Sequence, residues 1–366
     1  MSGLAASKNN PLTTAVSDLR QVFPGAELEI ERVDVDGSGF LQLTAATPEG
    51  ERWFTHDDRG LVERKPLSDS RIPLSKKLSG ASAEDLRTVS YRPGRRMVIE
   101  EKRNGAITTV LKGYRRRKST PAALNHRVAE EAMESGSFRI PRLLRHELEL
   151  ETLVFEYLDG DPFLVGKPAV EICFKIGTLL TRFQGLVRSA ELKKFQAEDE
   201  FGVLDTWRGK AFAGTGALPE GWDEARRSLD EAHACLSETQ WGLCHRDLHD
   251  GQILLVNGEP ALMDFDLLCQ ADTALDPANL LAHFSLRSLQ CFHGADDGTV
   301  RACGEALLDG VDRRKDGAFW NRLRFYQGTA FLRLALVYAL RPKWSKLCEP
   351  LVKLGKKCLE EQIRNA

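Results

Sequence analysis

The chain changes its local sequence pattern near its middle, and this change limits the folds that it can adopt. Residues 26–158 contain short alternating runs of apolar and polar residues separated by turn signals, a pattern typical of β-strands. After residue 166 the apolar residues recur at helical spacing, in segments 170–186, 224–236, 277–289, 319–340 and 345–363. The order of the two patterns predicts an α+β fold with two lobes.

The first lobe is predicted to hold an antiparallel sheet and one helix. Strands are expected at Leu86 to Ser90, Met97 to Lys102, Ile107 to Gly113, Leu143-Leu144 and Thr152 to Leu158. Asn104-Gly105 is a strong signal for a two-residue hairpin turn. Ser119-Thr120-Pro121 predicts the start of a helix that runs to about residue 135.

A shorter β-rich segment precedes this lobe. A helix is expected at Thr13 to Val22, and the alternation at 28–30 changes phase at 33–35, which predicts a strand with a bulge. Residues 26–63 hold ten acidic and three basic residues. With few large apolar side chains, this segment is not expected to fold alone. We therefore treat residues 1–85 as a β-rich cap that extends the first lobe.

Composition narrows the class of protein. The 366 residues include 51 Lys+Arg and 53 Asp+Glu, and this balance argues against a general nucleic-acid binder or a polybasic membrane protein. The most apolar stretch, Phe331 to Leu340, is interrupted by Arg333 and is too short to span a bilayer. The eight cysteines form no Cys-x-x-Cys pair and the start of the chain does not resemble a signal peptide. We expect a cytoplasmic monomer or homodimer.

The segment Cys244-His245-Arg246-Asp247-Leu248-His249-Asp250-Gly251-Gln252 is followed by two short apolar strands, an Asn257-Gly258 turn and then Asp264-Phe265-Asp266. Such a hairpin brings the loop before its first strand close to the residues after its second. Asp247, Gln252 and Asp264 can therefore converge, and their oxygen atoms suit Mg²⁺ and phosphoryl transfer. Asp, Asn and Gly also occupy surface turns for local reasons, but the ordered combination favours a functional site.

This segment resembles the catalytic and metal-binding loops of the aminoglycoside phosphotransferase-like superfamily, which shares the protein-kinase fold. The resemblance covers residues 86 to about 363. It implies an ATP-binding lobe at 86–158 and a helical lobe at 159–366 that carries the catalytic loop and the acceptor pocket. Gln252 occupies a position where most of the superfamily has Asn. The pattern His-x-Asp-x-His-x-Gly-Gln is similar to the maltokinase and glucosamine-kinase branch, where glutamine takes that role.

The resemblance assigns roles to matching residues. Asp247 would be the catalytic acid that orients or deprotonates the acceptor hydroxyl, while Asp264 and Gln252 would bind Mg²⁺. Asp266 would contact a second metal ion or hold the loop. His245 would support the loop through hydrogen bonds. Asp276, which precedes Pro277, is expected to cap the N-terminus of the next helix.

On the nucleotide side, the resemblance requires a lysine on the third strand of the first lobe, and Lys112 meets this requirement. Its partner would be Glu130, with Glu131 as the alternative. Gly94 would take the phosphate-loop position. The segment 153–158 resembles the hinge strand, where the backbone of Glu156 to Leu158 would bind adenine.

These features predict an ATP- and Mg²⁺-dependent phosphotransferase that acts on a hydroxyl of a small polar metabolite, preferably a sugar or amino sugar. An aminoglycoside or another secondary metabolite is the alternative acceptor. A nucleotide-binding pseudokinase and a protein kinase are the alternatives of another class. Residues 92–118 contain ten basic and two acidic residues. An ATP site accounts for this positive charge better than an RNA-binding stripe, so no nucleic-acid partner is expected.

Overall fold

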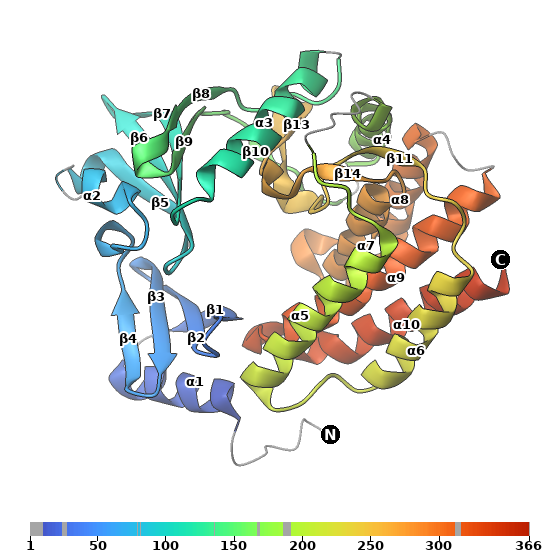
Figure 1. Ribbon diagram of the computed structural model, residues 1–366, viewed down its shortest axis with the longest axis horizontal. Helices are drawn as coiled ribbons and strands as arrows, with labels where there is room; N and C mark the ends of the chain where they lie inside the picture. The colour runs from blue at the N-terminus through green and yellow to red at the C-terminus, as the bar shows by residue number, and fades with distance from the viewer. Residues whose placement is uncertain are drawn as a thin grey trace.

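The computed structural model describes residues 10–23, 28–78, 80, 82–134, 136–166, 169–185, 192–311 and 316–365. Figure 1 shows β-sheets on one side of the molecule and a group of helices on the other, with the N-terminal sheet beside the second sheet. The combination of helices with antiparallel sheets confirms the predicted α+β class.

The first part of the chain forms one helix and a four-stranded antiparallel meander, which we call the cap sheet. Its elements are α1 (Pro11–Val22), β1 (Glu29–Val35), β2 (Leu41–Thr47), β3 (Gly50–Asp57) and β4 (Gly60–Arg64), and the strands lie in sequence order. The register of β1 against β2 shifts between Ile30 and Arg32. This shift is the bulge that the change of phase predicted.

The cap sheet contacts the helical lobe as well as the first lobe. Leu19, Val33 and Phe54 are buried in the core of the cap sheet together with Leu340, which lies far away in the sequence. The backbone N–H of Val33 donates to the carbonyl of Leu340 at 3.0 Å. Because a helical-lobe residue completes this small core, the cap sheet packs against both lobes.

Leu340→Ala should therefore destabilise the docking of the cap sheet. Leu340 is fully buried, and removing a buried leucine side chain costs about 2–5 kcal/mol of unfolding free energy. Leu148 is 64% exposed, so Leu148→Ala is the matched control, with an expected cost below about 0.5 kcal/mol. Urea unfolding of the two variants measures the difference. Equal stabilities would contradict the docking.

The second sheet contains five antiparallel strands in the order β5-β6-β7-β9-β8. The strands are β5 (Leu86–Arg92), β6 (Arg96–Arg103), β7 (Ala106–Tyr114), β8 (Leu143–Glu147) and β9 (Thr152–Glu156). On one face Ile99 and Leu111 pack against Ile72 and Leu74, the latter in the short helix α2 (Leu74–Leu78). On the other face Leu153 packs against Ala123 of α3 (Ser119–Glu134). The expected strands, hairpin and helix of the first lobe are confirmed.

The rest of the chain is mainly helical. Its helices are α4 (Val170–Gly185), α5 (Ala197–Thr215), α6 (Trp222–Ala234), α7 (Leu275–Leu289), α8 (Asp297–Val311), α9 (Gly317–Ala339) and α10 (Cys348–Arg364). Short strands β10 (Asp161–Pro162), β12 (Ile253–Val256) and β13 (Glu259–Leu262) form one small sheet, and β11 (Trp241–Cys244) pairs with β14 (Cys269–Asp272). Among the described helices, none combines the length and the apolar character that a membrane span requires.

Candidate active site

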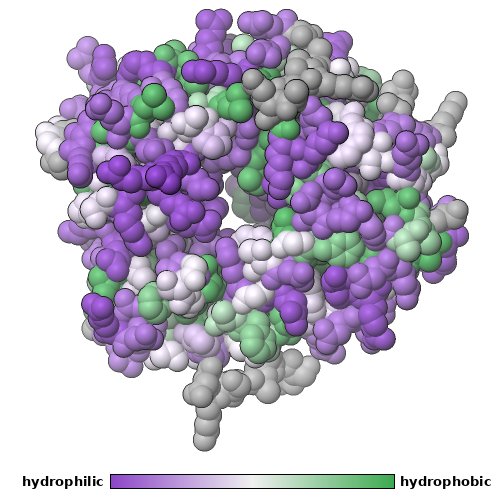
Figure 2. Space-filling view, viewed as in Figure 1, coloured by the Kyte–Doolittle hydropathy of each residue, from purple (hydrophilic) through white to green (hydrophobic). Residues whose placement is uncertain are grey.

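A cavity of about 610 Å³ lies between the five-stranded sheet and the β12–β13 hairpin. Its walls come from strands β5–β7, from the connection after β9 and from the segment 251–266. Val98, Val110 and Lys112 line it from the sheet because alternate residues of a strand share a face. In Figure 2 the centre of the molecule is hollowed, between the two sheets and the helices.

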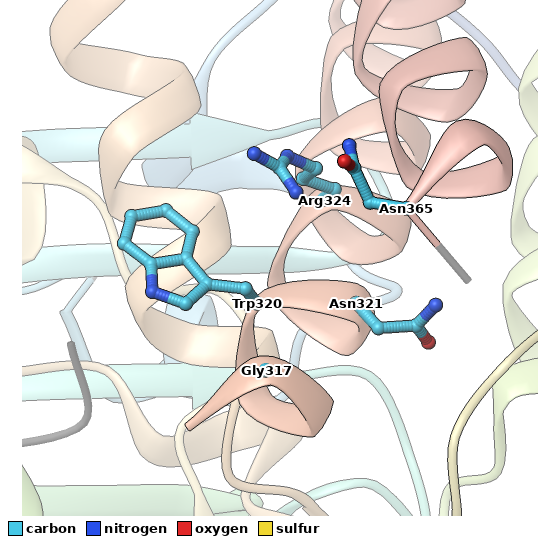
Figure 3. A pocket seen from close by; sticks show the side chains of 5 residues that line it. All are labelled: Gly317, Trp320, Asn321, Arg324 and Asn365. Carbon is cyan, nitrogen blue, oxygen red and sulfur yellow. The ribbon is translucent and has the colours of Figure 1, made fainter. Parts of the chain in front are cut away.

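A smaller hollow of about 280 Å³ lies far from this cavity, at the start of α9 (Figure 3). Its polar groups already have partners within the helical lobe. The Asn321 amide oxygen accepts from the backbone N–H of Ser237 at 2.8 Å, and Arg324 lies 3.8 Å from the Glu361 carboxylate. These contacts connect helices, and we assign this hollow no catalytic role.

The loop at residues 244–252, which is predicted to carry the catalytic residue and which we call the catalytic loop, is held by a buried carboxylate of α7. The two oxygens of Asp276 accept hydrogen bonds from the backbone N–H groups of His245 and Arg246, each at 2.7 Å. Arg246 has a φ of 70°, a left-handed conformation that is uncommon for a residue with a side chain. His245 Nε2 donates to the carbonyl of Met263 at 2.8 Å and so ties the loop to the end of β13.

The expected role of Asp276 as a helix cap is therefore wrong. Asp276 lies within the first turn of α7, and the residue at the capping position is Ala274. Burial raises the pKa of Asp276, while the charge of His245 and the two backbone N–H groups lower it. Its carboxylate acts on the loop, because both oxygens bind backbone groups there.

We expect Asp276→Ala to lower both stability and turnover. The substitution would leave two backbone N–H groups without an acceptor in a buried site, at a cost of about 2–5 kcal/mol in unfolding free energy. Asp276→Asn retains one acceptor oxygen and should show a smaller loss. Chemical denaturation and steady-state kinetics of the two variants measure these effects. An alanine variant as stable as the parent would refute this role.

The Asp247 carboxylate differs from that of Asp276, because it makes no hydrogen bond or ion pair with any described residue. It is partly exposed, and it follows directly after the loop residues that Asp276 holds. A carboxylate that is fixed through its backbone but has free oxygen atoms can accept a hydrogen bond from a bound hydroxyl group.

Lys112 lies between two carboxylates. Its Nζ atom lies 2.8 Å from Asp264 Oδ1 and 2.7 Å from Asp266 Oδ1. Asp266 also accepts from Arg96 at 2.8 Å and from the Tyr114 hydroxyl at 2.7 Å. Burial would raise the pKa of Asp264, but the charges of Lys112 and Arg96 outweigh burial and lower this pKa. The carboxylates of Asp264 and Asp266 therefore both lie against cationic side chains where they line the cavity.

Asp264 has φ 62° and ψ 69°, so its backbone is left-handed. Aspartate tolerates this conformation better than most residues because its short side chain can bond locally. The conformation occurs between the end of β13 and the 3₁₀ turn at Phe265–Leu267. A sharp turn at this point lets Asp264 and Asp266 face the same cavity.

Gln252 lines the cavity, as predicted, next to His249. The Nδ1 atom of His249 accepts from the backbone N–H of Gly251 at 3.0 Å, and its Nε2 atom lies 3.3 Å from the side-chain amide nitrogen of Gln252. A neutral imidazole that accepts at Nδ1 carries its proton at Nε2. The side-chain amide of Gln252 thus lies against the His249 ring, which helps to position it at the cavity.

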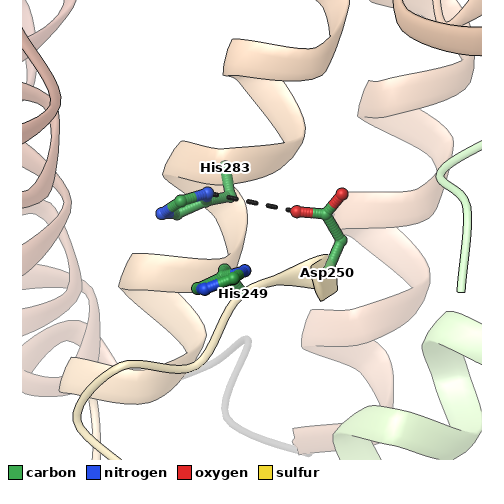
Figure 4. Close-up of side chains that lie close together, drawn as sticks. All are labelled: His249, Asp250 and His283. Atoms are coloured by element: carbon green, nitrogen blue, oxygen red, sulfur yellow. Dashed lines mark ion pairs between the residues drawn. The ribbon is translucent and has the colours of Figure 1, made fainter. Parts of the chain in front are cut away.

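His249, Asp250 and His283 form a second cluster beside the loop (Figure 4). Their donor atoms lie within 4.8 Å of one another, as in a metal site. However, the Asp250 carboxylate is bound by the Arg287 guanidinium at 2.7 and 3.0 Å. The two imidazole rings stack at 18° and do not point at a common centre. We interpret the cluster as a support for the catalytic loop.

Glu130 does not pair with Lys112, and the expected contact is corrected. Its Oε1 atom accepts from the backbone N–H of Leu143 at 2.7 Å and lies 4.0 Å from His126 Nε2. The face of α3 toward the cavity carries Ala122 and His126 instead. Burial lowers the pKa of His126 to about 4, so its ring is neutral at pH 7 and donates to the carbonyl of Pro141.

Gly94 is not part of the cavity wall, which corrects its expected position. It has a φ of 67°, in the turn between β5 and β6. The carboxylate of Asp69 accepts from the backbone N–H of Gly94 and, at 2.7 Å, from the hydroxyl of Tyr91. A side chain at Gly94 would collide with Arg71. The backbone donor that a phosphate would need is therefore used within the chain.

The end of β9 and the connection after it line the cavity with Glu156, Tyr157 and Leu158, where the hinge was expected. The backbone N–H of Glu156 donates to the carbonyl of Arg142 at 3.0 Å, so this donor is already used. Leu158 is buried and packs against Val256 and Ala261 of the hairpin. Binding of adenine by this backbone stays a prediction.

Sequence reasoning missed three residues that bind Asp266: Arg96, which lines the cavity, and Tyr114 and Asn125, which do not. The β6–β7 hairpin pairs Arg96 with Tyr114 and Val98 with Lys112. Counting pairs back from Asn104-Gly105 would have paired Lys112 with Met97 and put Arg96 on the opposite face, because the bulge between Glu101 and Lys102 shifts the register by one residue. Asn125 donates from Nδ2 to the carbonyl of Asp266 at 3.1 Å, but no sequence signal distinguished it from other polar helix residues.

A model of the phosphotransferase enzyme family matches residues 95–309. A search of curated proteins finds no match. Among solved structures, an amicoumacin kinase, hAmiN, in complex with AMP-PNP, Ca²⁺ and Ami is 14% identical, with 75% of this chain and 89% of that chain covered and a TM-score of 0.55. A choline/ethanolamine kinase family protein from Mesorhizobium loti is 13% identical, with coverages of 81% and 92% and a TM-score of 0.52.

Choline kinase LicA from Streptococcus pneumoniae is similar at 12% identity, with coverages of 80% and 98% and a TM-score of 0.52. At such identities these likenesses show the fold alone. The family match spans more than half of the chain and includes Lys112, the catalytic loop and Asp264. The chain therefore belongs to the phosphotransferase enzyme family.

Proposed function

We propose that this enzyme transfers the γ-phosphoryl group of ATP to a hydroxyl of a small polar metabolite, with Mg²⁺, and that the acceptor is a sugar or an amino sugar. One observation carries the proposal. Asp264 and Asp266 both bind the ammonium of Lys112 inside the cavity, whereas the Asp247 carboxylate has no partner among the described residues. Phosphoryl transfer needs carboxylates that bind cations and also one carboxylate that is free to contact the acceptor hydroxyl.

The residues of the cavity suit a magnesium ion. Carboxylate and amide oxygens are its preferred protein ligands, and Asp264, Asp266 and Gln252 supply them from one short segment. A cationic group, the ammonium of Lys112, already lies against both carboxylates. These three residues would hold the metal, which supplies neutralisation of charge on the phosphate oxygens when bound.

The residues of this chain would then act mainly by alignment and charge. Lys112 and Arg96 would bind phosphate oxygens, and the apolar walls around Val98 and Leu153 would exclude water from the base. Asp247 would accept the proton of the acceptor hydroxyl while the oxygen atom of that hydroxyl bonds to the γ-phosphorus. The bond to the bridging oxygen of the nucleotide breaks in the same transfer, and ADP leaves.

The preference for a sugar or amino sugar rests on the glutamine at position 252 and its motif. An aminoglycoside or another secondary metabolite is the alternative acceptor. A cytoplasmic location, where ATP is available, is part of the proposal.

ADP release with Mg²⁺ and ATP should be measured across sugars, amino sugars, aminoglycosides and a generic protein substrate, with Asp247→Ala as the control. We expect at least one small-molecule acceptor to raise turnover well above that of the variant. If no acceptor does so while ATP still binds, the chain is a nucleotide-binding pseudokinase. Turnover with the protein substrate alone would indicate a protein kinase.

A further inference from the structure

Three parts of the chain meet at one side of the active-site cavity. They are the end of β1 in the cap sheet, the turn between β5 and β6, and the helical lobe at α5 and the end of α9. The amide nitrogen of Gln42, which pairs with Asp34 from the neighbouring strand β2, donates to the carbonyl of Pro93 at 3.2 Å and so joins the cap sheet to the turn. Arg341 donates to the carbonyl of Val33 at 3.0 Å, which joins the third.

The charges at this meeting point are unbalanced. Five cations, which we call the basic junction, come from all three parts: Arg32, Arg92, Arg95, Lys210 and Arg341. Asp34, which is 5% exposed and lies 3.3 Å from Arg32 Nε, faces four of them, and Glu31 and Glu51 line one hollow with Arg32 and Arg341. Burial would raise the pKa of Asp34, but the charges of Arg32, Arg92, Arg341 and Lys210 lower it. These three carboxylates are fewer than the five cations, so positive charge remains in excess.

Three of these cations form no ion pair in the described part of the chain, although Lys210 Nζ lies 4.6 Å from the ring centre of Trp207. The Nε atom of Arg92 is buried without a hydrogen-bond acceptor, and no carboxylate in the described part of the chain forms an ion pair with Arg95 or Lys210. Burial, with Arg96 and Arg32 nearby, lowers the pKa of Arg92 to about 10. Burial also lowers the pKa of Lys210. Arg95 is exposed, but the partly buried charges of Arg92 and Lys210 are stabilised when an anion binds.

The basic junction lies next to the residues proposed to act on phosphate. Arg92 pairs across the β5–β6 turn with Arg96, which binds Asp266. Lys210 lies in the last third of α5, a helix that contacts β1 of the cap sheet. Strongly hydrophilic side chains also gather on the rim of the central hollow over the sheets (Figure 2).

We propose that the basic junction binds an anionic group of the acceptor, a phosphate or a carboxylate, while the acceptor hydroxyl faces Asp247. This inference rests on the proposed function and narrows its acceptor to an anionic metabolite. Guanidinium groups match both anions through paired hydrogen bonds, and the junction offers three of them within reach of one buried aspartate. The same charge disfavours a polycationic aminoglycoside or another ammonium acceptor.

Binding of inorganic phosphate to the full chain, saturated with Mg²⁺ and AMP-PNP, tests the site without turnover. Calorimetry should show saturable binding that weakens roughly tenfold in Lys210→Gln and in Arg92→Gln, as loss of one charge-assisted contact implies. Arg116→Gln removes an exposed cation of the first lobe and is the matched control, with affinity within about twofold of the parent. Lys210 is on a helix surface, so Lys210→Gln should fold normally. This variant therefore tests the site even if Arg92→Gln misfolds.

Equal phosphate affinity in all variants, or no saturable binding, would overturn the site. A loss only in Lys112→Ala would also overturn it, because the phosphate would then occupy the nucleotide cavity. ADP release with glucose, glucosamine, gluconate and glucose 6-phosphate tests the link to the acceptor. We expect the carboxylate or the phosphate compound to have the highest kcat/KM, reduced in Lys210→Gln. Preference for glucose or glucosamine would refute the anionic acceptor but support the proposed function.

Discussion

Asp247→Asn is expected to lower kcat by a factor of about 10²–10⁴, the range found for a lost general base. The affinity for AMP-PNP should stay within about twofold, because Asp247 does not line the nucleotide cavity. Unfolding stability should also be unchanged, since the carboxylate has no partner among the described residues and its removal leaves no group unsatisfied. Steady-state kinetics, nucleotide titration and thermal unfolding measure the three quantities.

Asp58→Asn is the matched control for this substitution. Asp58 is an exposed aspartate in the turn between β3 and β4, so its variant should have parental kcat. If Asp247→Asn retained more than about a tenth of parental turnover, the carboxylate would be an accessory group and proton acceptance would belong to another residue.

Asp264→Asn should have the second large effect, a loss of at least about 10² in kcat. Asparagine tolerates the left-handed backbone of this position, so the loop should keep its conformation. The variant loses the negative charge that faces Lys112 and Arg96. We therefore expect a higher Mg²⁺ concentration for half-maximal activity as well as a lower kcat.

The control for Asp264→Asn is Asp297→Asn, at an exposed aspartate in the first turn of α8. Its Mg²⁺ dependence should match that of the parent. An Asp264→Asn variant with the same Mg²⁺ dependence and kcat as the parent would move the metal to other ligands and would contradict the proposed role of Asp264.

Features encoded by neighbouring residues were predictable from the sequence. Asn104-Gly105 and Asn257-Gly258 form the expected hairpin turns, and all four residues have positive φ. Asn and Gly adopt such angles at low cost, so the dipeptide alone fixes the turn. The first turn and the bulge between Glu101 and Lys102 together set the strand pairing that places Lys112 at the cavity, and the second turn leads the chain back to Asp264.

Features that depend on packing between distant segments were not predictable in the same way. The sequence identified Asp276 as a polar residue at a helix start, but the position of the catalytic loop decides which N–H groups it meets. The rotation of α3 directs Glu130 to Leu143. Likewise, Leu340 packs in the core of the cap sheet although most of the chain separates it from that sheet in sequence. No local sequence pattern predicts such a contact.

The most direct test of the account follows the fate of the phosphoryl group. ATP labelled in its γ-phosphoryl group should be incubated with the full chain, Mg²⁺ and the acceptor panel, with Asp247→Asn in parallel. The account predicts label in a small-molecule phosphate ester, formed by the parent and nearly absent with the variant. Label only on protein, or label retained in ATP for every acceptor while the nucleotide binds, would contradict it.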